Sequence, residues 1–209
     1  MSRELTPLEK VYAARNQGEL ADAYASWSID YDRETVALGY CLPFVIAGWV
    51  ARYVAKGAGP LLDAGCGTGL AAPGLRALGY EQIEGLDFSG DMLAVAGERG
   101  FYRKLEHAEL GLPLPWPDGH FAAFLSAGVF TEGHAPPSSL DELARVTQGG
   151  GHAVFTVRDS VLERNGFRRT FRRLQEEGRW LPVEESRPFR AFVLGEPEVT
   201  VRAFVFRML

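Results

Sequence analysis

Several features that mark particular protein classes are scarce or absent in this sequence. Only two cysteines, Cys41 and Cys66, occur among 209 residues. They cannot form a disulfide framework, and both are expected to be reduced thiols. Long apolar runs are also lacking, because the most apolar early stretch, residues 41–54, is interrupted by Gly48 and Arg52 and is too short to span a bilayer. The N-terminus lacks the apolar segment of a signal peptide, so we expect a cytoplasmic protein.

Positive charge is not in excess either. The chain has 22 Lys and Arg against 27 Asp and Glu, which gives a net charge of −5. No general positive field would attract nucleic acid or an anionic membrane, so we expect neither DNA nor a membrane as a partner. The histidines His107, His120, His134 and His152 show no metal-ligand spacing, and we predict no metal site.

What the sequence does contain is the composition of a globular protein, with 46% hydrophobic and 23% charged residues. Its length fits one structural domain. From residue 61 onward, short apolar segments alternate with helical ones. The predicted strands are residues 61–64, 82–87, 101–108, 120–130 and 152–158, and the predicted helices between them are 70–79, 89–100 and 138–146. This alternation predicts an α/β fold with a parallel sheet and helices on both faces.

The two ends of the chain differ from this alternating region. Residues 1–56 are expected to be mainly helical and to form an N-terminal lid, with residues 57–209 as the core. A helix is predicted over roughly 160–178. Residues 187–209 then read as two strands with a turn at Gly195–Pro197, which can close the sheet edge as an antiparallel hairpin. The expected sheet has seven strands.

The stretch LLDAGCGTGL, residues 61–70, has the strand, glycine loop and helix order of a nucleotide site. A phosphate-binding P-loop needs Lys followed by Ser or Thr, which this loop lacks. The dinucleotide fingerprint fails because Leu70 stands at its last position. The pattern is D-x-G-x-G-x-G, from Asp63 to Gly69. It fits a ligand with a nucleoside and an amino acid end, because glycines allow close backbone approach and Asp63 can face an ammonium group.

Asp87 ends the second predicted strand. A carboxylate at this position can accept hydrogen bonds from two ribose hydroxyls, as in dinucleotide sites. Met92 follows early in the next predicted helix and could lie against an adenine ring.

Together these stretches resemble the class I S-adenosylmethionine-dependent methyltransferases. The matching segments are LLDAGCGTG, GLDFSGDML, LPWPDGHF and ELARVTQGGG, which span about residues 60–157. The resemblance implies a Rossmann-like sheet, S-adenosylmethionine as the cofactor and S-adenosylhomocysteine as its product. Within the family, YASWSIDYD, GVFTEGHAP and FTVR look like segments of the subgroup that includes the methyltransferase-like protein of the Williams–Beuren syndrome region. That likeness covers nearly the whole chain.

The resemblance also implies roles for individual residues. Asp87 matches the ribose-binding acid of the family, and Phe88 and Met92 match positions beside the adenine. The first family motif surrounds the methionine part of the cofactor, and its predicted site residues here are Asp63, Ala64, Gly65, Cys66, Gly67 and Gly69.

Further positions complete the cofactor site that the resemblance implies. Glu109 is the nearest candidate for the acid that bonds the adenine amino group. Ala127 and Gly128, at the end of the fourth predicted strand, match positions beside the sulfonium. Tyr24 and Tyr31 match aromatic residues that fold over the cofactor.

For several of these residues, a purely structural role is an alternative to cofactor binding, and the sequence leaves both interpretations open. Asp63 could merely bond the glycine loop, and Met92 could fill the core. Tyr24 and Tyr31 sit at helical spacing, so a packed helix face is a rival reading. Cys66 fits a small apolar filler better than a nucleophile.

His134 is the candidate catalytic residue. It follows the fourth predicted strand in TEGHAPP, on the rim where a methyl acceptor would approach. A base is needed only if the acceptor carries a proton that must leave. The alternative is a loop histidine with no part in the reaction.

The acceptor is less well defined than the cofactor. The stretch SAGVF stands where N-P-P-Y or D-P-P-Y would place a planar amino group, which argues against adenine, cytosine and glutamine amide acceptors. We expect a small-molecule acceptor and a monomer or homodimer, and a protein or RNA acceptor stays open. A different class also stays open, a module that binds the cofactor without turnover.

Overall fold

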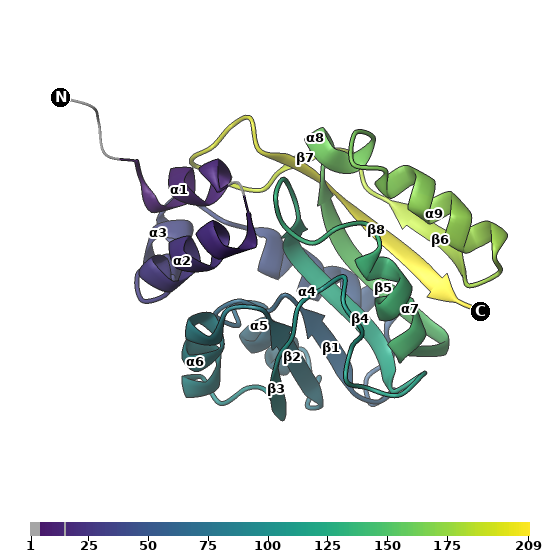
Figure 1. The fold of residues 1–209 in the computed structure, drawn as a ribbon. Coiled ribbons are helices and arrows are strands. Elements are labelled where there is room, and N and C mark those ends of the chain that lie inside the picture. The colour runs from purple at the N-terminus through teal and green to yellow at the C-terminus, as the bar shows by residue number, and fades with distance from the viewer. Residues whose placement is uncertain (1–4, 15) are drawn as a thin grey trace.

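The computed structural model describes residues 5–14 and 16–209, and Figure 1 shows their arrangement. The helices are α1 (Pro7–Ala13), α2 (Gln17–Trp27), α3 (Tyr31–Ala37), α4 (Leu42–Tyr53), α5 (Ala72–Ala77), α6 (Gly90–Glu98), α7 (Ser139–Val146), α8 (Asp159–Leu162) and α9 (Phe167–Glu176). The strands are β1 (Leu61–Ala64), β2 (Ile83–Asp87), β3 (Lys104–His107), β4 (Phe121–Phe130), β5 (Thr147–Arg158), β6 (Trp180–Glu185), β7 (Phe189–Arg190) and β8 (Thr200–Met208).

The strands form one sheet in the order β3-β2-β1-β4-β5-β8-β6, and β7 pairs with β8 outside this order. Strands β1 to β5 pair in parallel, whereas β8 runs antiparallel to β5, β6 and β7. The predicted Rossmann-like α/β sheet with antiparallel C-terminal strands is therefore confirmed, although the described residues form eight strands and not the expected seven. The strand order reverses between β1 and β4, and open α/β sheets bind ligands beyond the carboxyl ends of their strands at such a point.

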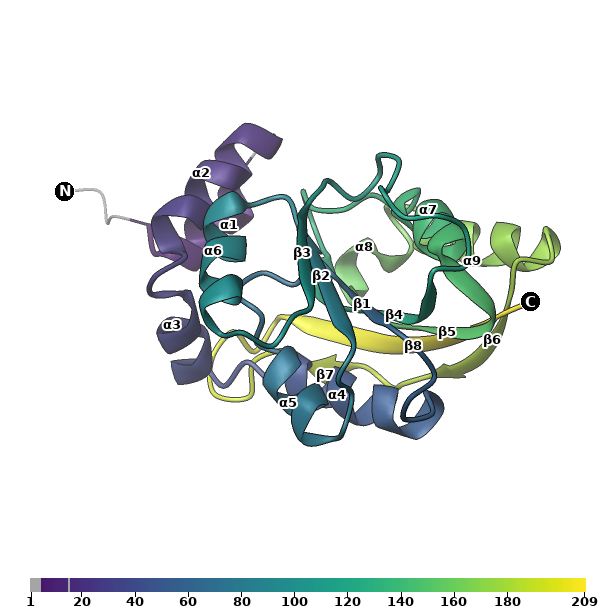
Figure 2. The ribbon, with the colours of Figure 1, turned by 90° about the horizontal axis from the view of Figure 1, so that it is seen from below.

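Helices cover both faces of the sheet (Figure 2). On one face, α4 and α5 bury Ile46, Val50 and Leu75 against the sheet residues Leu61 and Val154. On the other face, α7, α8 and α9 pack over a second apolar cluster that the sheet shares. Burial of apolar surface of this extent is the main favourable term in folding.

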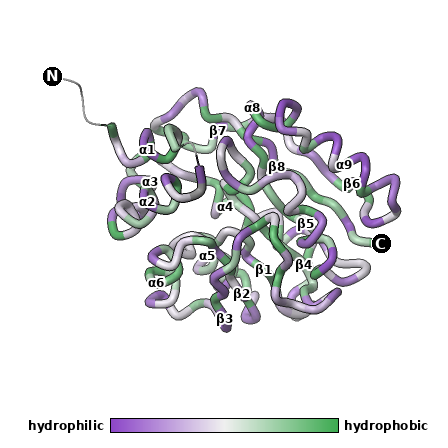
Figure 3. The backbone as a smooth tube through the Cα atoms, viewed as in Figure 1, coloured by the Kyte–Doolittle hydropathy of each residue, from purple (hydrophilic) through white to green (hydrophobic). Residues whose placement is uncertain are grey.

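Hydropathy follows these layers. Figure 3 shows hydrophobic residues gathered along the central strands and a largely hydrophilic α9 at the periphery. Helix α9 still buries Phe167, Phe171 and Leu174, which lie on one side of a helix because of their spacing. Its arginines then lie toward the surface, and Arg168 and Arg173 pair with Glu185 and Asp141.

The C-terminal pairing differs from the predicted hairpin. The outer strand is β6, whose segment WLPVEE was not predicted as a strand, and it pairs along β8. Pro182 lies inside β6, and a proline normally demotes a strand because it has no N–H to donate. It is tolerated here because β6 is an edge strand with a register shift between Pro182 and Glu184.

The predicted strand that begins at residue 187 is reduced to the two residues of β7. Beyond it, the backbone bonds the α3–α4 connection instead of β8: Cys41 N donates to Ala191 O (3.0 Å), and Val193 N donates to Gly39 O (3.0 Å). The turn at 195–197 therefore joins a loop to β8 and does not close a regular hairpin.

The predicted helix over 160–178 is also divided. Gly166 separates α8 from α9 and has a φ of 86°, in the left-handed region. A right-handed helix cannot continue through that conformation.

The N-terminal helices α1, α2 and α3 gather at the end of the sheet where the strand order reverses (Figure 1). They have a small apolar cluster of their own, with Val11, Leu20, Ala23 and Trp27 buried and Phe88 of the core packed against it. Helix α4 differs from them because it packs on the sheet. Within the described residues, no helix combines the length and apolar character needed to cross a membrane.

Candidate functional site

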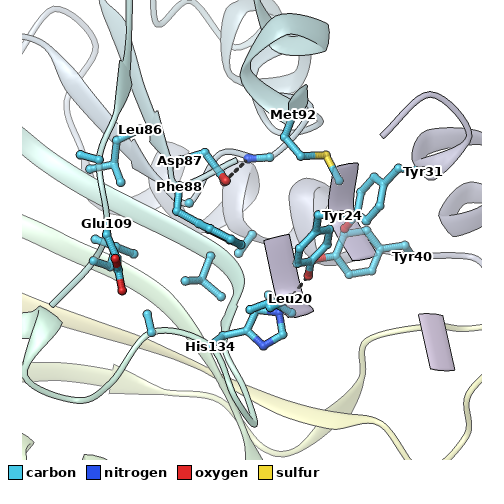
Figure 4. Close-up of a pocket in the computed structure, with 18 residues that line it drawn as sticks. Leu20, Tyr24, Tyr31, Tyr40, Leu86, Asp87, Phe88, Met92, Glu109 and His134 are labelled. Atoms are coloured by element: carbon cyan, nitrogen blue, oxygen red, sulfur yellow. Dashed lines mark hydrogen bonds between the residues drawn. The ribbon is translucent and has the colours of Figure 1, made fainter. Parts of the chain in front are cut away.

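A cavity lies at the strand-order reversal, between the loops after β1, β2 and β4 and the helices α2 and α3 (Figure 4). We call it the main cavity. Its lining residues are Leu20, Tyr24, Tyr31, Tyr40, Gly65, Gly67, Leu86, Asp87, Phe88, Met92, Ala108, Glu109, Leu110, Ala127, Gly128, Val129, His134 and Ala135. Apolar and aromatic groups dominate, and none of these described residues is Lys or Arg. A mostly apolar cleft with a few convergent polar groups is typical of a small-ligand site.

The glycine loop after β1 forms one wall of the main cavity. Gly65 and Gly67 line it, with φ values of 73° and 54° in the left-handed region. A Cβ on Gly65 would lie 2.4 Å from Cγ2 of Val129. The loop therefore needs glycine at this position for both conformation and space.

Asp87, the last residue of β2, lines the cavity beside this loop. Its carboxylate accepts hydrogen bonds from Gly67 N (2.8 Å) and Ser89 N (2.9 Å), and its side chain is buried. Ser89 in turn caps α6, because its hydroxyl accepts from Met92 N (3.3 Å). Burial raises the pKa of Asp87, and the backbone N–H groups act in the opposite direction. Carboxylate oxygens have further lone pairs, so Asp87 can also accept from a ligand hydroxyl.

Asp63, in β1, lies behind the loop. Tyr102 Oη donates a hydrogen bond to its carboxylate at 2.7 Å. Burial raises the pKa of Asp63 to about 7; the Tyr102 hydrogen bond lowers it, and the negative charge of Asp87 raises it further. A carboxyl group perturbed in this way beside a cleft is a candidate functional group.

A smaller cavity lies against Asp63, and we call it the loop-side cavity. It shares Tyr31, Tyr40, Gly65, Gly67 and Ala127 with the main cavity. Its other lining residues are Pro43, Asp63, Cys66, Thr68, Leu70 and Ala71. Burial raises the pKa of the Cys66 thiol well above its ordinary value, with smaller contributions from the nearby carboxylates. Cys66 is therefore a protonated, inert thiol at neutral pH.

Among the aromatic residues of α2 and α3, Trp27 packs inside the helical cluster, whereas Tyr24 and Tyr31 line the main cavity. Trp27 is buried, and its indole N–H donates to Glu34 at 2.7 Å. Tyr24 and Tyr31 face the main cavity, and the Tyr24 ring meets the Phe88 ring edge-on at 6.1 Å between centroids. The helical spacing thus serves both packing and cavity lining.

His134 reaches the main cavity from the loop after β4 (Figure 4). Its Nδ1 lies 2.8 Å from the carbonyl oxygen of Glu132, and its Nε2 lies 2.9 Å from Tyr24 Oη. Thr131 Oγ1 also lies 3.1 Å from Nδ1. A carbonyl oxygen can only accept, whereas a hydroxyl can accept or donate, so we assign the proton to Nδ1 from its shorter contact with Glu132, and Nε2 then accepts from the tyrosine. Burial lowers the pKa of His134, which favours the neutral ring. Within residues 5–14 and 16–209, no group of three or more His, Cys, Asp or Glu is placed to hold a metal ion.

The structure brings most of the predicted site residues together. Those that line the main cavity are Tyr24, Tyr31, Gly65, Gly67, Asp87, Phe88, Met92, Glu109, Ala127, Gly128 and His134. Asp63 and Cys66 line the loop-side cavity instead. Ala64 and Gly69 line neither, because Ala64 is buried within β1 and Gly69 packs against the Tyr102 ring.

Sequence reasoning missed several lining residues. Tyr40 has no motif around it; it lies in the connection between α3 and α4 and lines the cavity from there. Leu20 could have been found, since it lies one helical turn before Tyr24 on the same helix face. The remaining missed residues are Leu86, Ala108, Leu110, Val129 and Ala135, which flank predicted positions in the sequence.

Comparison with known proteins decides the family. A model of the methyltransferase domain matches residues 62–155. Methyltransferase-like protein 27 of Homo sapiens is 34% identical over 183 residues, which cover 82% of this chain and 73% of that protein. The chain belongs to the methyltransferase family.

Solved structures with this methyltransferase fold support the architecture. A TehB-like SAM-dependent methyltransferase from Corynebacterium glutamicum has a TM-score of 0.64 at 20% identity, covering 90% of this chain and 100% of that one. Geranyl diphosphate C-methyltransferase from Streptomyces coelicolor, solved with S-adenosyl-L-homocysteine, has a TM-score of 0.62 at 14% identity, covering 86% and 84%. At these identities the likeness shows the fold alone.

Proposed function

We propose that this member of the methyltransferase family uses S-adenosylmethionine and transfers its methyl group to a small-molecule acceptor. The finer resemblance, to the subgroup of the Williams–Beuren syndrome region protein, is part of the same proposal, as are a cytoplasmic location and a monomer or homodimer. The observation that carries the proposal is Asp87. It is a buried carboxylate held by Gly67 and Ser89, and it lines a mostly apolar cavity, which fits ribose hydroxyls beside a planar base.

The residues present fit the proposed cofactor in three parts. Asp87 would accept hydrogen bonds from the ribose hydroxyls, and Phe88 and Met92 would flank the adenine. Glu109, which lines the same cavity and is exposed, would accept from the adenine amino group. The glycine loop would approach the methionine part closely, because a Cβ at Gly65 has no room.

The methionine end carries an ammonium group, and Asp63 would compensate its charge. Its carboxyl group is buried, with a pKa of about 7, so a neighbouring cation would favour the ionised form. Ala127 and Gly128 at the end of β4 would lie beside the sulfonium.

S-adenosylmethionine supplies an activated methyl group, so the protein has mainly to align the acceptor with it. The lining suits this task, since it excludes water with apolar and aromatic groups. His134 would take up a proton from the acceptor where one must leave.

The N-terminal helices would act as a lid. The main cavity has a volume of about 90 Å³ in this arrangement, whereas sites for ligands of this size usually have about 300–1,000 Å³. Tyr24 of α2 and Tyr31 of α3 line the cavity on the side of these helices. An outward movement of α2 and α3 would admit the cofactor, and their return would exclude water.

Calorimetry with the purified protein tests the cofactor. S-adenosylmethionine and S-adenosylhomocysteine should bind, and NAD should not. Absence of binding by both sulfur ligands at millimolar concentration would refute the proposal. Transfer of labelled methyl to a metabolite extract, and not to a protein or RNA extract, is the expected result for the acceptor. Cofactor binding without any transfer would instead indicate a binding module.

A further inference from the structure

A further cavity lies next to the main cavity, on the side of β8, and we call it the β8-side cavity. Its walls come from the N-terminal helices and from the segment that leads into β8. The lining residues are Leu8, Val11, Tyr24, Trp27, Tyr31, Thr35, Tyr40, Leu42, Gly128, Thr131, His134, Arg158, Ala191, Phe192, Val199 and Val201. None of the cofactor positions around Asp87 belongs to it.

The two cavities have a common wall made of Tyr24, Tyr31, Tyr40, Gly128 and His134. Gly128 packs closely against Tyr40 in this wall. A Cβ there would lie 2.2 Å from Tyr40 Oη, and φ at Gly128 is 74°. Because Gly128 also matches the position beside the sulfonium, a molecule in the β8-side cavity would approach the methyl group from the far side of this wall.

His134 gives the common wall a proton acceptor. Its Nδ1–H is directed to the Glu132 carbonyl, which leaves the Nε2 lone pair facing Tyr24 Oη at 2.9 Å. In this closed arrangement a phenolic hydroxyl therefore already occupies Nε2. A group that takes its place must itself be a hydrogen-bond donor, and a carboxylate has no proton to donate.

The rest of the lining selects an uncharged molecule. Apolar side chains from α1, the start of α4 and the segment before β8 make up most of the surface. Arg158 is the single lysine or arginine among the described lining residues, and it pairs with Glu132 at 3.0 Å. An ionised acceptor would lose its hydration here without gaining an unneutralised partner.

We propose that the β8-side cavity is the methyl-acceptor site, and that it takes an uncharged apolar molecule with a hydroxyl group, of the phenol type, whose O–H donates to His134 Nε2 in place of Tyr24. This inference rests on the proposed function. In the step, the acceptor oxygen forms a bond to the methyl carbon while the carbon–sulfur bond breaks. The electron pair of that bond goes to sulfur, which becomes a neutral thioether, and the hydroxyl proton goes to Nε2. The products are a methyl ether, S-adenosylhomocysteine and one proton, which the imidazolium releases to water.

The first test uses binding of small probes to the protein saturated with S-adenosylhomocysteine. The probes are 4-methylphenol, 4-methylbenzoate and 4-methylbenzylamine, which share a ring and differ in charge. We expect 4-methylphenol to bind at millimolar concentration and the two charged probes to bind at least about tenfold more weakly. Equal or tighter binding of the benzoate would overturn the inference.

A variant that fills the β8-side cavity tests whether 4-methylphenol binds there. Val199 lines the cavity and is buried, so Val199→Phe should fill it; Val193→Phe, on the same segment but 54% exposed, is the matched control. Val199→Phe should weaken 4-methylphenol binding at least about tenfold and leave the affinity for S-adenosylhomocysteine unchanged. If Val199→Phe does not fold, Ala191→Leu is measured in its place. Unchanged phenol binding in a folded cavity variant would overturn the inference.

Incubation with labelled S-adenosylmethionine completes the test. We expect 4-methylphenol to yield 4-methylanisole, and His134→Gln to lose this product while cofactor affinity is kept. Cofactor binding without binding of any probe would refute the acceptor site and leave the proposed function intact. Failure of S-adenosylhomocysteine to bind would refute both.

Discussion

Asp32 of α3 accepts a hydrogen bond from the hydroxyl of Thr68, in the glycine loop, at 2.6 Å. The other oxygen of the same carboxylate pairs with Arg99, at the end of α6, and Arg99 Nε also donates to the carbonyl of Thr68 at 2.6 Å. The N-terminal helices are thus tied to the loop that would hold the methionine part of the cofactor. Any movement of α3 away from the cavity has to break the two contacts that Asp32 makes, with Thr68 and with Arg99.

Removal of the Asp32 charge should loosen the N-terminal helices. Asp32→Asn keeps an oxygen that can accept from Thr68 but loses the ion pair with Arg99. This ion pair is half-buried, so it stabilises the protein more than an exposed ion pair would. We expect residues 18–35 to exchange amide hydrogen faster in the variant, and S-adenosylhomocysteine to slow the exchange in both proteins. Asp30→Asn removes a more exposed ion pair with Arg33 on the same segment and is the control. Equal exchange with and without ligand in the wild-type protein would contradict a lid.

Asp87→Ala should weaken cofactor binding. Charge-assisted hydrogen bonds contribute roughly 1.5–3 kcal/mol each, so loss of two ribose contacts should lower the affinity for S-adenosylhomocysteine at least about tenfold. The variant also leaves Gly67 N and Ser89 N without their acceptor, so some loss of stability is expected as well. Asp91→Ala, an exposed carboxylate in the first turn of α6, should change neither. Unchanged affinity in folded Asp87→Ala would refute the ribose role.

Asp63→Asn should change stability in a pH-dependent way. The pKa of Asp63 is about 7 in the folded protein, against an ordinary value of 3.8. Between these values the folded state holds a proton that the unfolded state has released, so the free energy of unfolding falls as pH rises through this window. Because Asn cannot ionise, the free energy of unfolding of Asp63→Asn should not fall in this way.

We therefore expect Asp63→Asn to gain in melting temperature relative to wild type between pH 5 and pH 8, while its affinity for S-adenosylmethionine decreases. Parallel melting curves for the two proteins over this range would show that the Asp63 carboxyl group does not titrate there.

His134 should act as a base down to mildly acidic pH. Burial lowers its pKa from 6.5, so the neutral ring persists below the range of about 6–7 that the sequence predicts for an ordinary histidine. The unfolded state takes up the proton first, so the free energy of unfolding should fall as pH drops below 6.5. His134→Ala should remove this dependence and lower the transfer rate by about 10²–10⁴ with cofactor affinity nearly unchanged. Wild-type turnover of His134→Ala on the identified acceptor would end this assignment.

Cys66 should resist alkylation. Its thiol is buried in the glycine loop, and burial raises its pKa well above the ordinary value, so very little thiolate exists at neutral pH. Mass spectrometry after treatment of the folded protein with iodoacetamide at pH 7.5 should find Cys66 unmodified, and cofactor affinity should be unchanged by the reagent. Rapid modification of Cys66, with loss of cofactor binding, would indicate a reactive loop.

Local patterns in the sequence were sufficient for much of the fold and for one half of the candidate site. The alternation of short apolar strands with helices predicted the parallel sheet, because side-chain periodicity reflects which faces are buried. The glycine loop and Asp87 were recognisable because their roles depend on backbone conformation and on a position directly after a strand.

The tertiary structure alone decided the rest. Edge strand β6 contains Pro182 and forms because it pairs with β8, which comes later in the chain. Local propensity cannot predict this pairing. Tyr40 and Val199 have no motif around them, and the stretch YASWSIDYD gives no sign that its last residue, Asp32, contacts Thr68. The positions of all three residues depend on how the N-terminal helices pack over the sheet and the segment before β8. The β8-side cavity exists only between these elements, since long-range packing, not local sequence, places side chains from distant segments around one space.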